Sequence, residues 1–138
     1  MTGVIDEAGV RYESTSYDGS ARATQSTFAG NIDTTMITYN SDNSATVLTP
    51  LGTSTNLTFN VATGPVEVAS VSQPCGPECK QPWSARTYNG DGFPATSTDF
   101  NGNVVTTGYD YVGLMYQKTE ASGTSNQRTT NINWNLNL

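Results

Sequence analysis

The chain has 138 residues with a formal net charge of −6, and only 13% of its residues are charged. Its six Lys and Arg residues are scattered, whereas nucleic-acid binding depends on clustered basic residues that neutralise phosphates. No stretch approaches the roughly 20 apolar residues that span a bilayer. These features exclude nucleic acid as a partner and a membrane-spanning segment.

The composition favours strands over helices. Thr, Ser, Asn, Val and Gly are abundant, and these residues suit strands and turns rather than helices. The length fits a single domain that spans residues 1–138. We therefore predict an all-β fold.

An aromatic residue followed by Asp or Asn recurs along the chain at intervals of 20 to 29 residues. Asp or Asn at the head of a turn can hydrogen-bond to its own backbone, so each pair predicts the end of a strand and the start of a turn. We expect the recurring rings to stack as a repeat core. They are Tyr17, Tyr39, Phe59, Tyr88, Tyr109 and Trp134.

Glycines form a second landmark between these aromatic anchors. Because glycine tolerates a left-handed backbone, they predict the turn between the two strands of each unit. The turn glycines are Gly9, Gly30, Gly52, Gly102 and Gly123. Each unit is then one β-hairpin, and the alternation in "TMITY" has the period of two that strands require. The units predict repeats near 9–38, 39–59, 88–108 and 109–134, with a loop insertion at 60–87.

Two stretches carry a family resemblance: "SYDGSARATQSTFAGN" at 16–31 and "TYNGDGFPATSTDFNGNVVTTGYDYVGLMYQKTEASGT" at 87–124. They resemble the YD repeat of RHS proteins, which is also found in teneurins and in the shells of insecticidal toxin complexes. The likeness covers nearly the whole chain and corresponds to about four repeats. It departs at Ala21, where a turn glycine is usual, and at Asn40 and Asn89, where Asp is usual. It implies antiparallel hairpin repeats that form a curved, solenoid-like meander.

The resemblance also implies a function. In that family, YD repeats form a hollow shell around a toxin or effector, or present a surface. This chain would then be a non-enzymatic wall segment of a secreted or surface-displayed bacterial protein, with neighbouring repeats of a parent chain as partners. The family's "DPxGL" self-cleavage signature is absent, so self-proteolysis is not carried over. The opening "MTGVIDEAGV" has no signal-peptide pattern, and we expect the export signal to lie outside this chain.

A search for catalytic groups is mostly negative. The chain has no His, which excludes the usual Ser and Cys triads and imidazole metal sites. A glycosidase needs two carboxyls across a cleft, and we interpret the pairs Asp6 with Glu7 and Asp91 with Asp99 as turn carboxylates. The sequence predicts no enzyme activity, no metal and no cofactor.

Cys75 and Cys79 are the only cysteines, and they interrupt the repeat in "PCGPECK". Two thiolates alone do not complete a tetrahedral zinc site, and the three-residue spacer is not the redox C-x-x-C motif. We predict a local disulfide that clasps this loop, with free thiols as the alternative. A disulfide would favour an oxidising compartment.

Two rival functions remain. Trp83 and Tyr111 lie off the repeat register beside polar residues, and they are candidate sugar contacts for a carbohydrate-binding surface. The terminal "NINWNLNL" alternates polar and apolar residues without a charge. It predicts an exposed edge strand through which copies of the chain could assemble into filaments or oligomers.

Overall fold

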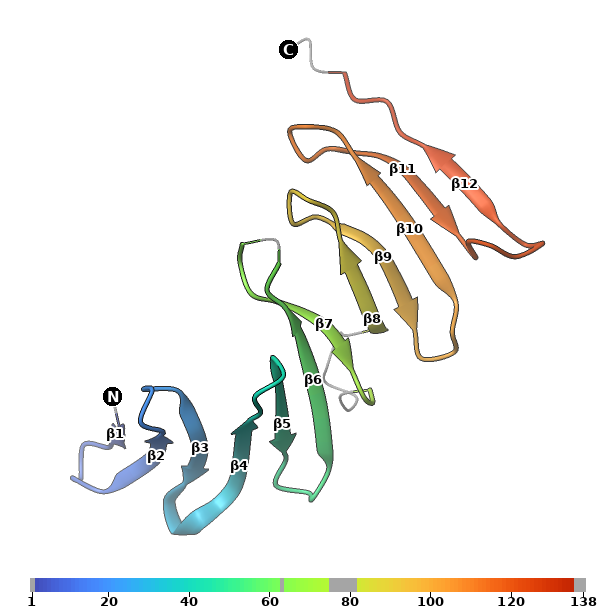
Figure 1. Cartoon of the computed structure of the whole chain (residues 1–138). Helices are drawn as coiled ribbons and strands as arrows, with labels where there is room; N and C mark the ends of the chain where they lie inside the picture. Colours follow the sequence, from blue (N-terminus) through green and yellow to red (C-terminus); the bar gives the residue numbers. More distant parts are fainter. Residues whose placement is uncertain (1, 63, 75–81, 136–138) are drawn as a thin grey trace. The chain divides into compact units, whose positions relative to one another are not determined.

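The computed structural model describes residues 2–62, 64–74 and 82–135, and it is built from strands (Figure 1). A short 3₁₀ turn, η1, spans Ala29–Asn31, and the described residues contain no α-helix. The strands are β1 (Gly3–Ile5), β2 (Arg11–Tyr17), β3 (Ala23–Phe28), β4 (Ile32–Tyr39), β5 (Ser44–Leu48), β6 (Ser54–Asn60), β7 (Glu67–Val71), β8 (Trp83–Tyr88), β9 (Pro94–Asp99), β10 (Val104–Tyr109), β11 (Met115–Glu120) and β12 (Arg128–Asn131).

The order of hydrogen-bonded neighbours is the sequence order, from β1 to β12. The strand pairs are antiparallel, as in the hairpins β2–β3, β8–β9 and β10–β11. This arrangement confirms the predicted all-β fold and its antiparallel meander. It also means that each strand exchanges backbone hydrogen bonds with its sequence neighbours.

The chain groups into two compact units, Met1–Leu57 and Thr58–Leu138, where the sequence predicts a single domain. The first unit contains β1 to β5 and the start of β6. The second contains the end of β6 and the strands β7 to β12.

The segment predicted as a loop insertion, 60–87, contains β7 and residues 83–87 of β8, so that prediction is wrong for these two strands. β7 has neither an aromatic residue nor a glycine, and the landmarks used to find repeats therefore miss it. Its Val71 side chain is only 4% exposed, which shows that β7 is an integral strand of the second unit.

One turn geometry recurs in both units. Its first residue is an Asp or Asn whose Oδ1 accepts the backbone N–H groups two and four residues later. The same residue's N–H donates to the carbonyl four residues later, and its carbonyl accepts the N–H three residues later. This is a three-residue hairpin loop, a type I turn followed by a left-handed residue. It begins at Asp6, Asp18, Asn89, Asp99 and Asp110.

The fourth residue of this turn has a positive φ, which glycine adopts without steric cost. Gly9 and Gly102 occupy it with φ of 77° and 84°, whereas Ala21 occupies it with φ of 59°. Thr49 heads a related turn in which Gly52 has φ of 79°. Gly30 and Gly123 also have positive φ, so all five glycines assigned to turns adopt the left-handed backbone.

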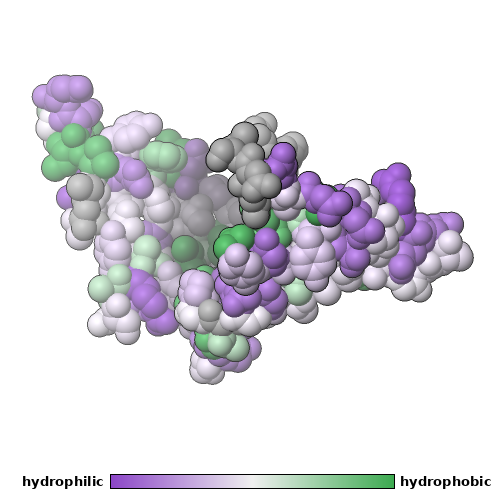
Figure 2. Space-filling view, turned by 90° about the horizontal axis from the view of Figure 1, so that it is seen from above, coloured by the Kyte–Doolittle hydropathy of each residue, from purple (hydrophilic) through white to green (hydrophobic). Residues whose placement is uncertain are grey.

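The aromatic anchors are not a buried core, contrary to the prediction. The buried apolar side chains among the described residues are Ala45 and Val71, at 2% and 4% exposure. Tyr17 and Trp134 are about half exposed, at 44% and 52%. The visible surface in Figure 2 is mostly hydrophilic, with hydrophobic residues in separate groups. Within each unit the described strands form no second layer that would cover the rings, and this explains the difference.

The terminal "NINWNLNL" also differs from its prediction. Only its first residue, Asn131, belongs to β12, and residues 132–135 are not in a strand. The Ile132 N–H donates to the carbonyl of Tyr116 at 2.8 Å, so the segment still follows β11 for a short distance. The edge strand is instead Arg128–Asn131, which includes a charged residue and is exposed throughout. Residues 136–138 lie outside the described residues.

A pair of substitutions tests the backbone requirement of the recurring turn. We expect Ala21→Gly to raise the free energy of unfolding by about 0.5–1 kcal/mol, because it relieves a left-handed alanine. Gly102→Ala should lower it by about 1 kcal/mol, since a Cβ there meets nothing within 4 Å and only the backbone is affected. Denaturant unfolding measures both. Destabilisation of similar size in the two variants would contradict the role of φ.

Candidate functional site

Three of the aromatic anchors are tied to an earlier strand by a side-chain hydrogen bond. In each case the polar tip of the side chain donates to a backbone carbonyl of that strand: β3 for Tyr39, β7 for Tyr88 and β11 for Trp134. The bonds are Tyr39 Oη to Ala23 O at 3.0 Å, Tyr88 Oη to Val68 O at 2.7 Å and Trp134 Nε1 to Met115 O at 2.9 Å. The anchors therefore hold neighbouring strands together from the side chain as well as from the backbone.

The faces of two anchor rings are occupied by a residue from the preceding hairpin. The Arg22 guanidinium lies over the ring of Tyr39, 4.3 Å from its centroid. The ring of Phe93 stacks on Tyr109, with centroids 5.1 Å apart and planes inclined by 27°. Arg22 and Phe93 each stand five residues after the previous anchor, so this contact recurs at the repeat spacing. It supplies packing between hairpins without a buried core.

A row of threonines crosses the second unit, one from each of five strands. Each member is paired directly with the next, so all five side chains lie on the same face. The row is Thr87, Thr96, Thr106, Thr119 and Thr129. The Thr87 and Thr96 hydroxyls are hydrogen-bonded at 2.7 Å, and those of Thr119 and Thr129 at 3.0 Å.

We call this side of strands β8 to β12 the threonine face. The alternation of side chains along a strand and the pairing across strands define its members. They are Ala85, Thr87, Thr96, Thr98, Val104, Thr106, Gly108, Gln117, Thr119, Thr129 and Asn131. None of these side chains carries a charge. The Gln117 and Asn131 amides are hydrogen-bonded to each other at 3.1 Å.

The opposite side of the same strands, the charged face, contains the ionised residues. Its members are Arg86, Ser97, Val105, Thr107, Lys118, Glu120, Arg128 and Thr130. Glu120 accepts from Lys118 at 2.8 Å and is also paired with Arg128. The hydrogen bonds from Lys118 and Arg128 lower the pKa of Glu120 to about 2. Charge is therefore segregated to one side of these strands.

Tyr116 lies beside the threonine face, and sequence reasoning assigned it no role. A Cβ added to Gly108 would lie 2.7 Å from Cζ of Tyr116, so the phenol ring covers this glycine. The residue is an extra one in its strand, because the pairing shifts between Gly108 and Tyr109. Tyr116 is 50% exposed, and it is therefore the accessible aromatic residue next to the row of threonines.

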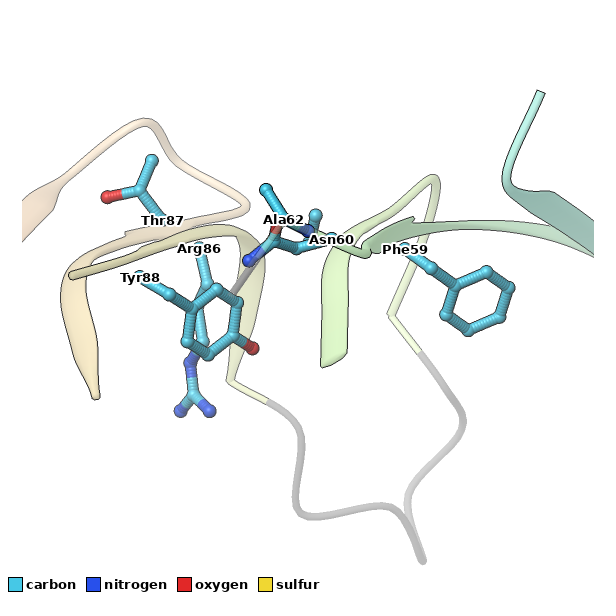
Figure 3. Close-up of a pocket in the computed structure, with 7 residues that line it drawn as sticks. Phe59, Asn60, Ala62, Arg86, Thr87 and Tyr88 are labelled. Carbon is cyan, nitrogen blue, oxygen red and sulfur yellow. The ribbon is translucent and has the colours of Figure 1, made fainter. Parts of the chain in front are cut away.

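A depression of about 400 Å³ lies in the second unit, where β7 meets β8. It is lined by Phe59, Asn60, Ala62, Ala69, Arg86, Thr87 and Tyr88. Thr87 points to one side of β8, while Arg86 and Tyr88 point to the other, and the ring of Phe59 is turned away from them (Figure 3). Among the described residues, the ladder between β7 and β8 consists of the pair Ser70 and Ala85.

The lining of this depression does not assemble acid–base chemistry. Among the described residues that line it, Arg86 is the one ionised side chain and none is a carboxylate. The Arg86 Nε donates to Ser97 Oγ at 3.2 Å, and its guanidinium lies 4.2 Å from the Trp83 ring centroid. Within the described ranges, no group of three or more Cys, Asp or Glu side chains could hold a metal ion.

The structure separates the two candidate sugar contacts. Trp83 begins β8, whereas Tyr111 follows the end of β10. These two strands run in the same direction because β9 lies between them, so the residues stand at opposite ends of the strands. Tyr111 is 94% exposed, whereas the ring of Trp83 is covered by Arg86. The two side chains do not form one platform, and sugar binding stays a prediction.

The predicted disulfide between Cys75 and Cys79 lies outside the described residues. The acidic residues that sequence reasoning assigned to turns can be placed. Asp6 and Asp99 each head one of the recurring turns. Hydrogen bonds from the Asn103 side chain and backbone lower the pKa of Asp99. Asp91 lies inside the Asn89 turn, where its N–H donates to Asn89 Oδ1 at 3.1 Å.

No protein-family model matches the chain, and no curated protein matches its sequence. In the part of the chain that the structure describes, no helix has the length and apolar character needed to cross a membrane.

The Tyr88 hydroxyl tests whether anchor side chains hold neighbouring strands together. We expect Tyr88→Phe to lower the free energy of unfolding by about 1 kcal/mol, because the carbonyl of Val68 loses its 2.7 Å partner. Tyr111→Phe is the matched control, since that side chain is 94% exposed, and it should change stability by less than about 0.5 kcal/mol. Equal effects in thermal unfolding would show that the bond contributes nothing specific.

The ion-pair cluster on the charged face predicts a pH dependence. The folded-state pKa of Glu120 lies below its ordinary 4.5, so the cluster stabilises the fold above that pH. This contribution disappears as the pH falls toward about 2. Arg128→Gln should raise the pKa of Glu120 toward its ordinary value, as measured by NMR titration of the carboxyl carbon. Arg86→Gln, which changes a cation outside the cluster, should leave it unchanged, and an unchanged pKa in both variants would refute the assignment.

Proposed function

We propose that this chain is a non-enzymatic structural segment, a strip of β-sheet wall in a secreted or surface-displayed assembly of the bacterial RHS type. The observation that carries the proposal is the strictly sequential strand order, in which one turn geometry recurs at five of the strand connections, those that begin at Asp6, Asp18, Asn89, Asp99 and Asp110. Such an array can be lengthened by further repeats without a change in its local contacts. The role of the wall, to enclose or present another component, rests on the YD-repeat resemblance.

The chemistry of the described residues supports a structural role over a catalytic one. The pKa of Asp18 is lowered chiefly by the backbone N–H of Arg22, and the pKa of Asp99 by the side-chain amide and the backbone N–H of Asn103. Glu120 is paired with two cations. Carboxylates engaged in this way remain ionised at neutral pH, and a general acid needs the opposite shift.

A wall must have two inequivalent sides, one toward the component and one toward solvent. Val105 and Thr106 are adjacent residues of β10 on opposite faces, and both are partly exposed. We expect Val105→Cys and Thr106→Cys, made in the natural protein that contains this segment, to react with a polar maleimide at rates that differ about tenfold. Cys75 and Cys79 are replaced by Ser in both variants.

The control is the same labelling in denaturant, where the two positions should react alike. Equal rates in the native protein would contradict a wall, because both faces would then be open to solvent. A tenfold difference that disappears when the assembly is dissociated would support one. Which position is protected identifies the side that faces the component.

A further inference from the structure

Within the second unit, the described residues form no second layer over the sheet, whereas antiparallel sheets normally have one face covered. Antiparallel sheets pack one face on other elements and leave the other in water, because strands alone bury little apolar surface. In this unit Val71 is the buried apolar side chain among the described residues. The physics of the sheet therefore favours a second layer over one of its faces.

The charged face is the costly one to cover. Removing Arg86, Lys118 or Arg128 from water carries a desolvation penalty that close pairing only partly returns. Glu120 already forms ion pairs with Lys118 and Arg128 at the surface, where water also solvates the charges. A covering layer gains little on this side.

The threonine face lacks such a penalty. Its eleven members include no charged residue. Three pairs of its polar side chains are hydrogen-bonded within the face: Thr87 with Thr96, Thr119 with Thr129, and Gln117 with Asn131. Polar groups that already have partners cost little to remove from water. Threonine methyl groups add apolar surface that a second layer would bury.

The threonine face also matches itself. Each hydroxyl and each amide can both donate and accept a hydrogen bond, so two such faces would meet without an excess of donors. Because the face carries no charge, no like charges would meet. An isologous two-fold contact places the same surface on both partners. Two twisted sheets that pack face to face lie about 10 Å apart with their strands inclined by roughly 30°. We propose that the threonine face packs against the threonine face of a second copy of this chain.

The size of the face sets the expected strength. Five strands at about 4.8 Å and six residues at about 3.4 Å give a surface of about 24 by 20 Å per copy. Two copies would remove on the order of 1,000 Å² from water, near the lower end for specific interfaces. Tyr116, half exposed at the side of the face, is the aromatic anchor that such an interface needs. The dimer should therefore be weak, with a dissociation constant on the order of micromolar.

This inference goes beyond the proposed function, which does not specify what covers the sheet, and its test uses the 138-residue chain in solution. Analytical ultracentrifugation from low to high micromolar concentration should show a monomer–dimer equilibrium. Thr106→Lys puts a charge at the centre of the threonine row and should abolish the dimer. Val105→Lys puts the same charge on the adjacent residue of the charged face and should leave dimerisation unchanged.

Tyr116→Ala is a second variant that leaves the row intact, and it should weaken the dimer about tenfold. Far-UV circular dichroism confirms that each variant keeps its strands. A wild-type chain that remains monomeric overturns the inference while leaving the labelling test of the wall untouched. A dimer that survives Thr106→Lys also overturns it, because assembly would then use the edge strands instead of the threonine face.

Discussion

The register of the strands depends on one interaction: the Asp or Asn oxygen that accepts two backbone N–H groups at the start of each recurring turn. Asp99 shows it clearly, with bonds of 2.8 Å to both Asn101 and Asn103. A hairpin closed in this way has a defined loop length, and loop length sets which residues face each other. A slip of one residue would move every side chain to the other face. From β8 to β11, the row of threonines and the segregation of charge both follow from the turns at Asn89, Asp99 and Asp110.

The sequence predicts the turns well because they are local. An aromatic residue followed by Asp or Asn, and a glycine some residues later, mark chain reversal through the hydrogen bonds of a few neighbouring residues, as at Asp18 and Gly102. The same landmarks miss β7, which has neither feature. They also place the terminal edge strand too far toward the C-terminus. The backbone pairing with β11 ends at Ile132, which is the second residue of the alternating segment "NINWNLNL".

The two faces could not be read from the sequence. Thr96 and Thr119 are 23 residues apart, and they become members of one row only when the registers of three strands are known together. Tyr116 reaches this side because of an extra residue in β11, and no pattern of period two predicts such a bulge. The buried core of rings was expected from spacing alone. Spacing predicts that the rings recur, but burial requires a second layer.

The absence of a covered face also changes what stabilises the described hairpins. With little apolar burial, the free energy comes from backbone ladders, cross-strand pairs and the contacts of the anchor rings, each of modest size. Contacts of this kind act between neighbouring strands, so stability is graded along the chain, and a joint with a short ladder opens first. Between β7 and β8 the described ladder is the pair Ser70 and Ala85, and Tyr88 adds its bond to Val68. A side chain thus supports a strand junction with a short backbone ladder, where one more hydrogen bond is a larger share of the contact than at a long ladder.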